Sequence, residues 1–180
     1  MKKLFFITLA AFAFTACEKN DPIIPNEEEL ITTLIYTLTP DGGGSPVELK
    51  FQDLDGDGGN VPVISGGTLI ANTTYSGSLR LLNEIESEDI TLEVEEEGDE
   101  HQFFFSVSGL NANVDYADTD ANGKPVGINT TLTTGAASNG QLTITLRHEP
   151  AKDASGVVNG DITNAGGETD IEVTFDVAIQ

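Results

Sequence analysis

The chain has two histidines, and both stand beside acidic residues of the kind that can bind a metal ion. His101 follows the run EVEEEGDE, and His148 directly precedes Glu149. Imidazole nitrogens and carboxylate oxygens are ordinary ligands of zinc and other transition metals, so His101 and His148 form a candidate metal site with carboxylates such as Glu96, Glu97, Glu100 and Glu149. No H-x-H or H-x-x-x-H spacing supports this site. We favour the simpler alternative, a rim pair in which the Glu96 carboxylate favours the charged form of His101.

The acidic stretch DLDGDGGN is a candidate calcium loop. Asp53, Asp55 and Asp57 occupy the first, third and fifth positions of an EF-hand-type loop, and a glycine occupies the sixth. This spacing can direct three carboxylates at one Ca²⁺, which takes about six to eight oxygens. The last position of the loop is Ile64 instead of glutamate, so Asn60 or another loop would have to complete the site. We favour an ordinary turn, because only half of the motif is present.

The segment DTDANG matches the same calcium-loop spacing more weakly. Asp118, Asp120 and Asn122 repeat the D-x-D-x-N spacing, and Asn129 stands where the final glutamate should be. Asn122 followed by glycine is itself a strong turn signal, so a turn is again the favoured interpretation over a second calcium site.

The only cysteine, Cys17, closes a stretch with the layout of a bacterial export signal. Two lysines precede an apolar run that is too short to span a bilayer, and small residues stand just before Cys17. The sequence FTAC resembles a lipobox, in which lipid is attached to the cysteine and the chain is cut before it. The resemblance implies a signal peptide over residues 1–16, a lipidated acidic tether over 17–29 and a domain over 30–180. The alternative is a secreted protein with an unmodified thiol; in neither case can an internal disulfide form.

The charge of the chain restricts its partners. The sequence has 8 basic and 30 acidic residues, and removal of residues 1–16 takes away two of the lysines and leaves a formal charge of about −24. Such a field repels nucleic acid and attracts cations or a basic protein surface. We therefore expect no nucleic-acid partner, and the ten acids between Glu84 and Glu100 are the best candidate for cation attraction.

Alternation of apolar and polar residues predicts the fold class. From Leu30 onward, apolar residues recur at every second position in short runs separated by Gly, Asn, Asp and Pro clusters. About nine such strands and no convincing helix predict an all-β, antiparallel sandwich. The expected strands lie near residues 30–38, 47–51, 75–81, 89–97, 101–107, 112–116, 126–132, 141–148 and 171–179.

One expected hairpin has a definite register. If Gly98-Asp99 is a two-residue turn, Ile90 faces Val107, Leu92 faces Phe105, Val94 faces Phe103 and Glu96 faces His101. All but the last of these pairs are apolar, so a slip by one residue would be costly.

Counting strand directions from this turn predicts which features lie together. The Gly98 turn, the 118–123 loop and His148 should share one end of the sandwich. We expect residues 53–60 to join them if residues 61–65 are irregular, and to move to the opposite end if those residues form a strand.

The segment LIANTTY resembles the tyrosine corner of fibronectin type III and related immunoglobulin-like domains. Leu69 precedes Tyr75 by six residues, Thr73 lies between them, and Ala71 replaces the usual proline. The resemblance implies an immunoglobulin-like sandwich in which the tyrosine hydroxyl bonds back to the chain at the crossing between sheets.

A longer resemblance covers residues 30–180. The segments DLDGDGGN, GGTLIANTTYSGSLRLLNE, EEEGDEHQFFFSVSG, TTLTTGAA, LTITLRHEP and GGETDIEVTFDV are similar to a group of small Gram-negative outer-membrane lipoproteins. This group often carries the label "type 1 periplasmic binding fold superfamily".

The likeness implies a lipid-anchored outer-membrane protein facing the periplasm or the cell surface. We expect a non-enzymatic module that binds a ligand or serves a TonB-dependent receptor, because Cys17 is committed to the anchor and no catalytic spacing stands out. The alternative is a metal-capture protein with zinc at the histidine end and calcium at the aspartate loops.

Overall fold

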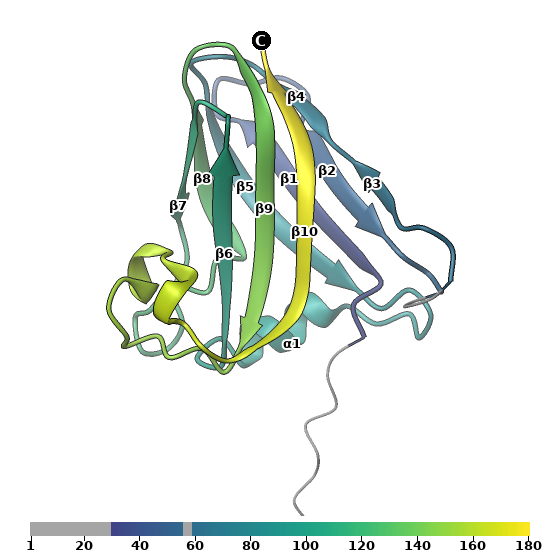
Figure 1. The fold of residues 1–180 in the computed structure, drawn as a ribbon, viewed down its shortest axis with the longest axis vertical. Coiled ribbons are helices and arrows are strands. Elements are labelled where there is room, and N and C mark those ends of the chain that lie inside the picture. Colours follow the sequence, from purple (N-terminus) through teal and green to yellow (C-terminus); the bar gives the residue numbers. More distant parts are fainter. Residues whose placement is uncertain (1–29, 56–58) are drawn as a thin grey trace, which may run out of the picture.

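A computed structural model describes residues 30–55 and 59–180 and shows a β-sandwich of two sheets (Figure 1). The expected signal peptide, the lipidation site Cys17, the tether and Asp57 lie outside the described residues. Within the described part, no helix has the length and apolar character that a membrane crossing requires. The expected all-β sandwich is thus confirmed.

The larger sheet has six strands in the order β3-β2-β1-β5-β8-β7, and each neighbouring pair is antiparallel. Its strands are β1 (Thr33–Pro40), β2 (Val47–Gln52), β3 (Val63–Ser65), β5 (Thr74–Leu82), β7 (Ala112–Tyr116) and β8 (Asn129–Thr134).

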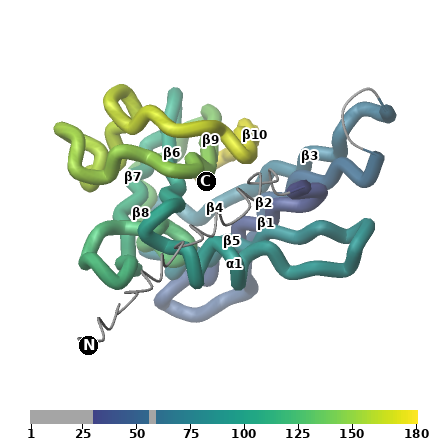
Figure 2. Tube along the Cα trace, turned by 90° about the horizontal axis from the view of Figure 1, so that it is seen from below, coloured from purple at the N-terminus to yellow at the C-terminus, as the bar shows by residue number. Residues whose placement is uncertain are grey.

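The smaller sheet has four strands in the order β4-β10-β9-β6, and its β4–β10 pair is parallel. Its strands are β4 (Gly67–Leu69), β6 (His101–Ser108), β9 (Ser138–His148) and β10 (Glu168–Ile179). Figure 2 shows the two sheets as separate layers when the molecule is seen from below.

The core lies between the sheets and follows the alternation of the sequence. Leu34, Tyr36 and Leu38 of β1 are fully buried, and in β10 every second residue from Ile171 to Ile179 is buried. Burial of such a side chain contributes about 1.5–3 kcal/mol. The strand order by itself does not establish an immunoglobulin-like topology, which stays a prediction.

The segment expected as a strand over 89–97 is instead the helix α1 (Ile90–Glu96). The Asp89 side chain accepts a hydrogen bond from Thr91 N and so caps the helix. Ile90 and Val94, four residues apart, are buried, whereas Leu92 is 62% exposed. The alternation of three apolar residues misled the prediction, because two of them also fit the spacing of one helix face.

The hairpin register proposed for this region is therefore wrong. β6 pairs with β9 instead of with residues 89–97, so that Phe103 lies opposite Leu146 and Phe105 opposite Ile144. Glu96 is not opposite His101; that position in the ladder belongs to His148. The apolar face of β6 was assigned correctly, but its partner strand was not.

The tyrosine corner makes the contact that the resemblance implied. The Tyr75 hydroxyl accepts a hydrogen bond from Ile70 N at 2.7 Å, and Tyr75 itself is buried. The contact ties the start of β5 in one sheet to the end of β4 in the other.

The position of the DLDGDGGN loop was predicted incorrectly. β3 forms, yet the loop lies at the α1 end of the sandwich, at the β2–β3 edge of the larger sheet (Figure 1). Only Gly66 separates β3 from β4, so the chain passes between sheets without reversing its direction. A Cβ on Gly66 would lie 1.9 Å from Asp176 O, which explains the glycine at this crossing.

The segment between β9 and β10 folds over the outer face of the smaller sheet. It contains two short 3₁₀ helices, η1 (Val157–Asn159) and η2 (Ile162–Asn164). Val157 and Ala165 bury Phe104, an outward-facing residue of β6, in a second apolar cluster.

The helix assignment predicts a contrast between two aliphatic residues. Replacement of Ile90 by Ala should lower the free energy of unfolding by about 2–5 kcal/mol, because it opens a cavity in the core. Leu92→Ala should change it by less than about 0.5 kcal/mol, because Leu92 faces solvent. Urea denaturation measures both, and a similar large loss in the two variants would instead support the strand.

Candidate metal centre

The strand register brings the two histidines together at one end of the smaller sheet. His101 begins β6 and His148 ends β9, and the two are direct partners in the antiparallel ladder. Their rings stack with centroids 4.6 Å apart and an interplanar angle of 29°. The expected meeting of the Gly98 turn, the 118–123 loop and His148 is also observed. Lys152 bonds both Gly98 O and Asp120 Oδ2, and Glu149 N, next to His148, bonds Glu100 O beside the Gly98 turn.

Asp170 of β10 completes the cluster, and the sequence analysis missed it. The β9–β10 register shifts between Thr169 and Ile171, so Asp170 is an extra residue in a bulge. Its side chain is only 3% exposed; Oδ2 lies 3.9 Å from His101 Nε2, and Oδ1 lies 3.8 Å from His148 Nδ1. In a regular strand, Asp170 would share the outward parity of Glu172. No sequence signal predicts the bulge that turns it toward the histidines.

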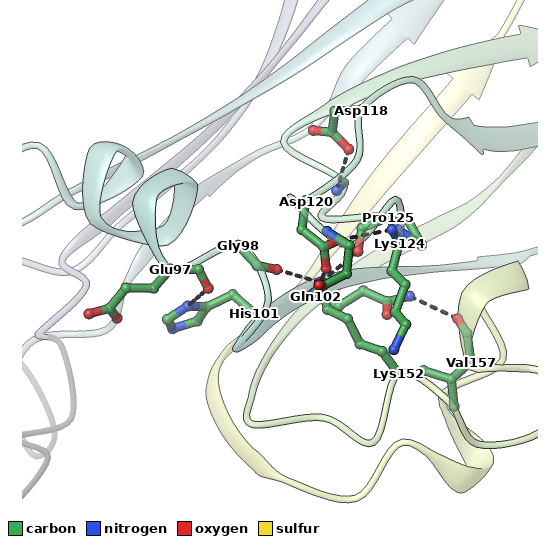
Figure 3. Close-up of polar contacts among 12 residues, drawn as sticks. Glu97, Gly98, His101, Gln102, Asp118, Asp120, Lys124, Pro125, Lys152 and Val157 are labelled. Atoms are coloured by element: carbon green, nitrogen blue, oxygen red, sulfur yellow. Dashed lines mark hydrogen bonds and ion pairs between the residues drawn. The ribbon is translucent and has the colours of Figure 1, made fainter.

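The protonation state of His101 is set by its surroundings. His101 Nδ1 donates a hydrogen bond to Glu97 O at 3.2 Å (Figure 3). Glu97 is the C-cap residue of α1, so the end of this helix fixes the orientation of the ring. Because a carbonyl can only accept, Nδ1 carries the proton in the neutral ring, and Nε2 presents its lone pair toward Asp170. Burial lowers the pKa of His101, and the hydrogen bond to Glu97 opposes this only in part. A histidine that ligates a metal usually donates its other ring N–H to a carboxylate, a backbone carbonyl or water, so the bond to Glu97 O is compatible with a ligand role.

The three side chains have nearly the spacing of ligands on one ion. One ligand atom from each of His101, His148 and Asp170 lies within 4.8 Å of the other two. Ligand atoms of a tetrahedral zinc ion with bonds of about 2.0–2.2 Å are about 3.3–3.5 Å apart. The 3.9 and 3.8 Å distances to the histidines run to different Asp170 oxygens, so side-chain rotations would have to bring the three ligand atoms closer by up to about 1.4 Å. Two imidazoles with one carboxylate are a common zinc ligand set.

Glu96, the carboxylate expected beside the histidines, lies elsewhere. It is exposed on α1 and lines a cavity of about 290 Å³ with Glu95, Asp99 and Asp118, a set of side chains that excludes both histidines. Its expected pairing with His101 is not formed, because the segment is helical.

A buried lysine occupies the centre of the neighbouring acidic loop. The Lys152 ammonium donates to Gly98 O, to Pro125 O at 2.9 Å and to Asp120 Oδ2 at 3.0 Å (Figure 3). Burial alone would raise the pKa of Asp120, but hydrogen bonds from Lys124 N and Lys152 lower it overall. Burial lowers the pKa of Lys152, while Asp120 favours its charged form.

The aspartates of DTDANG are thus engaged by protein donors. Asp118 accepts hydrogen bonds from Gly127 N and Asn129 N, and Asp120 Oδ1 accepts from Asn122 N and Lys124 N. These bonds organise the loop as a turn, and the other Asp120 oxygen, Oδ2, accepts a hydrogen bond from the Lys152 ammonium. Calcium at Asp118, Asp120 and Asn122 stays a prediction that this bonding pattern does not favour.

The first aspartate loop also closes on itself. Asp55 Oδ2 accepts hydrogen bonds from Asn60 N at 2.9 Å and from Asn60 Nδ2 at 2.5 Å, and the bond from Asn60 N is the largest cause of the lowered pKa of Asp55. Asp55 N in turn donates to Asp53 Oδ1 at 3.4 Å. These contacts are those of a hairpin turn between β2 and β3, and calcium at Asp53, Asp55, Asp57 and Asn60 stays a prediction.

Comparison with known proteins adds no relative. The chain matches no protein-family model, no curated protein and no solved structure. The function is therefore proposed from the geometry of the site and the sequence features described above.

The buried Lys152–Asp120 pair predicts a large loss of stability. Lys152→Met should lower the free energy of unfolding by about 3–5 kcal/mol, because it leaves the Asp120 carboxylate buried without its cation. The matched control is Lys124→Met, whose partner Asp153 is 90% exposed, and it should cost less than about 1 kcal/mol. Urea denaturation of both variants checks this, and equal losses would contradict it.

Proposed function

We propose that the protein is a non-enzymatic, lipid-anchored module of the outer membrane that captures a transition-metal ion, of which zinc fits best. The observation that carries the proposal is the buried convergence of His101, His148 and Asp170 from three adjacent strands. A lipid anchor at Cys17 would hold the module at the membrane, facing the periplasm or the cell surface. The strong negative charge favours an inorganic cation over an anionic ligand.

The choice of zinc follows from the ligand chemistry. Imidazole nitrogens suit zinc, copper, nickel and iron, whereas calcium and magnesium take oxygen ligands. Three protein ligands leave one tetrahedral position for water or for a group from a partner.

The purified protein should bind about one zinc ion per chain. His148→Gln and Asp170→Asn should each weaken zinc binding by more than about tenfold, because each removes a ligand. Isothermal titration calorimetry and metal analysis measure the affinity and the stoichiometry. Addition of zinc at about 100 times its dissociation constant should raise the free energy of unfolding by about 2.7 kcal/mol, and EDTA should reverse this increase.

Asp176→Asn is the matched control for Asp170→Asn. Asp176 lies on the same strand but belongs to the exposed outer row, where it accepts a hydrogen bond from Gln141. Its replacement should leave zinc binding unchanged. Absence of bound metal, together with melting that responds to neither zinc nor EDTA, would refute the metal-capture function.

A second candidate function, as accessory to an outer-membrane receptor, is favoured by one of the two edges that the larger sheet has within the described residues. β3 is an edge strand with all three residues exposed, and Val63 and Ile64 are 64% and 50% exposed. An exposed apolar edge strand is suited to pairing with a strand of another protein.

Val63→Lys should abolish co-purification of a receptor from detergent-solubilised membranes, because a charge on an edge strand blocks pairing. Val158→Lys, at a 41% exposed residue of η1, is the matched control and should retain the receptor. Mass spectrometry identifies the receptor. Retention of the receptor by Val63→Lys would exclude β3 as the docking edge.

A further inference from the structure

The three ligands of the candidate metal centre differ in their contact with solvent. The side chain of His101 is 0% exposed and that of Asp170 is 3% exposed, whereas that of His148 is 10% exposed. Of these three, His148 therefore offers the most direct contact with solvent. An ion that reaches the buried centre has to lose its water there.

Two exposed glutamates lie at this outer side of His148. Glu100 precedes His101 and Glu149 follows His148, so the ladder pairing of the histidines also places the two glutamates side by side. Glu149 N donates a hydrogen bond to Glu100 O at 2.6 Å, which ties their backbones together. One ligand atom from each of Glu100, Glu149 and His148 lies within 4.8 Å of the others.

His148 thus belongs to two ligand groups, one exposed and one buried. We propose that Glu100, Glu149 and His148 form an outer loading position, from which a divalent transition-metal ion passes to His101, His148 and Asp170. This inference rests on the proposed metal-capture function and concerns how the ion arrives.

The chemistry of the two groups supports this order. Exposed carboxylates attract a hydrated divalent ion and hold it loosely, because the ion can keep most of its water. The buried group supplies two imidazole nitrogens and a carboxylate of low exposure, which together replace that water. Both groups include the His148 ring, so one side chain is common to the two ligand sets.

The backbone holds Glu149 in a defined place for this role. Glu149 has a φ of 50°, a left-handed conformation that is uncommon for a residue other than glycine. Opposite it, a Cβ on Gly167 would lie 2.1 Å from His148 O and 3.0 Å from Glu149 O. The chain therefore passes closely over this corner and keeps Glu149 beside Glu100.

The test compares association and dissociation rates of nickel(II), which accepts imidazole and carboxylate ligands and exchanges its water slowly enough for stopped-flow measurement. In the full chain, Glu100→Gln/Glu149→Gln should slow nickel association roughly tenfold at low salt. The dissociation rate should fall by a similar factor, because the ion leaves by the route through which it enters, and the dissociation constant should remain within about twofold of the original, because the buried ligands are intact. The difference in association rate should shrink as salt is added.

The matched control is Glu95→Gln/Glu96→Gln, which removes the same charge from the same end of the sandwich. These two glutamates line the cavity beside Asp99 and Asp118. The control should slow association far less than the loading variant. If both double variants slow association equally, the ion is attracted only by the overall negative field of the protein. That result would overturn the loading position.

Equilibrium titration of the unaltered protein with nickel separates the two proposals. If it binds no ion, both the metal centre and the loading position are refuted. If it binds one ion and the Glu100→Gln/Glu149→Gln variant associates at the original rate, the loading position alone is refuted. A faster dissociation in that variant would show that the glutamates are permanent ligands, which also overturns the proposal.

Discussion

The buried Lys152 ammonium is the interaction on which the functional end of the sandwich depends. It joins the Gly98 turn, which precedes His101, to the loop that contains Asp120 and Pro125. Lys152 itself begins the excursion between β9 and β10, just after His148. Because a buried ammonium without partners is very costly, these three segments have to stay together for the chain to fold. The two histidines are thereby held at one end of the smaller sheet. The acidic loop is paired with a cation of the protein itself, because Asp120 bonds the Lys152 ammonium.

The candidate metal centre results from strand pairing and one irregularity. The β6–β9 register places His101 opposite His148, and the bulge in β10 turns Asp170 inward to face both of them. The helix α1 adds a carbonyl that orients His101. A cluster of this kind has an inner side that lies in the core and an outer side that reaches the acidic surface at Glu100 and Glu149. The same sheet thus carries the buried His101, His148 and Asp170 and, beside them, the exposed Glu100 and Glu149.

Much of the fold could be predicted from local pattern, and the site only in part. The alternation of apolar and polar residues in β1, β5, β9 and β10 was sufficient to predict the sandwich. Counting of strand directions correctly predicted that His148 lies at the same end as the Gly98 turn. The segment from Ile90 to Glu96 was misassigned, because Ile90 and Val94 satisfy both a strand and a helix face. Asp170 was not predicted as a site residue, because a bulge depends on the pairing of two strands and is not visible in the residue spacing of a single strand.

The sequence by itself determined the apolar periodicity, the negative charge and the presence of two histidines among many acids. These properties follow from residue types and their spacing, which are local. Tertiary structure decided which carboxylates meet the histidines: it placed Glu96 at a separate cavity and brought Asp170 inward. It also decided that Lys152 fills the DTDANG loop and that Asn60 closes on Asp55 in DLDGDGGN. Such contacts join residues far apart in the chain or depend on loop closure, so their geometry exists only once the strands have paired.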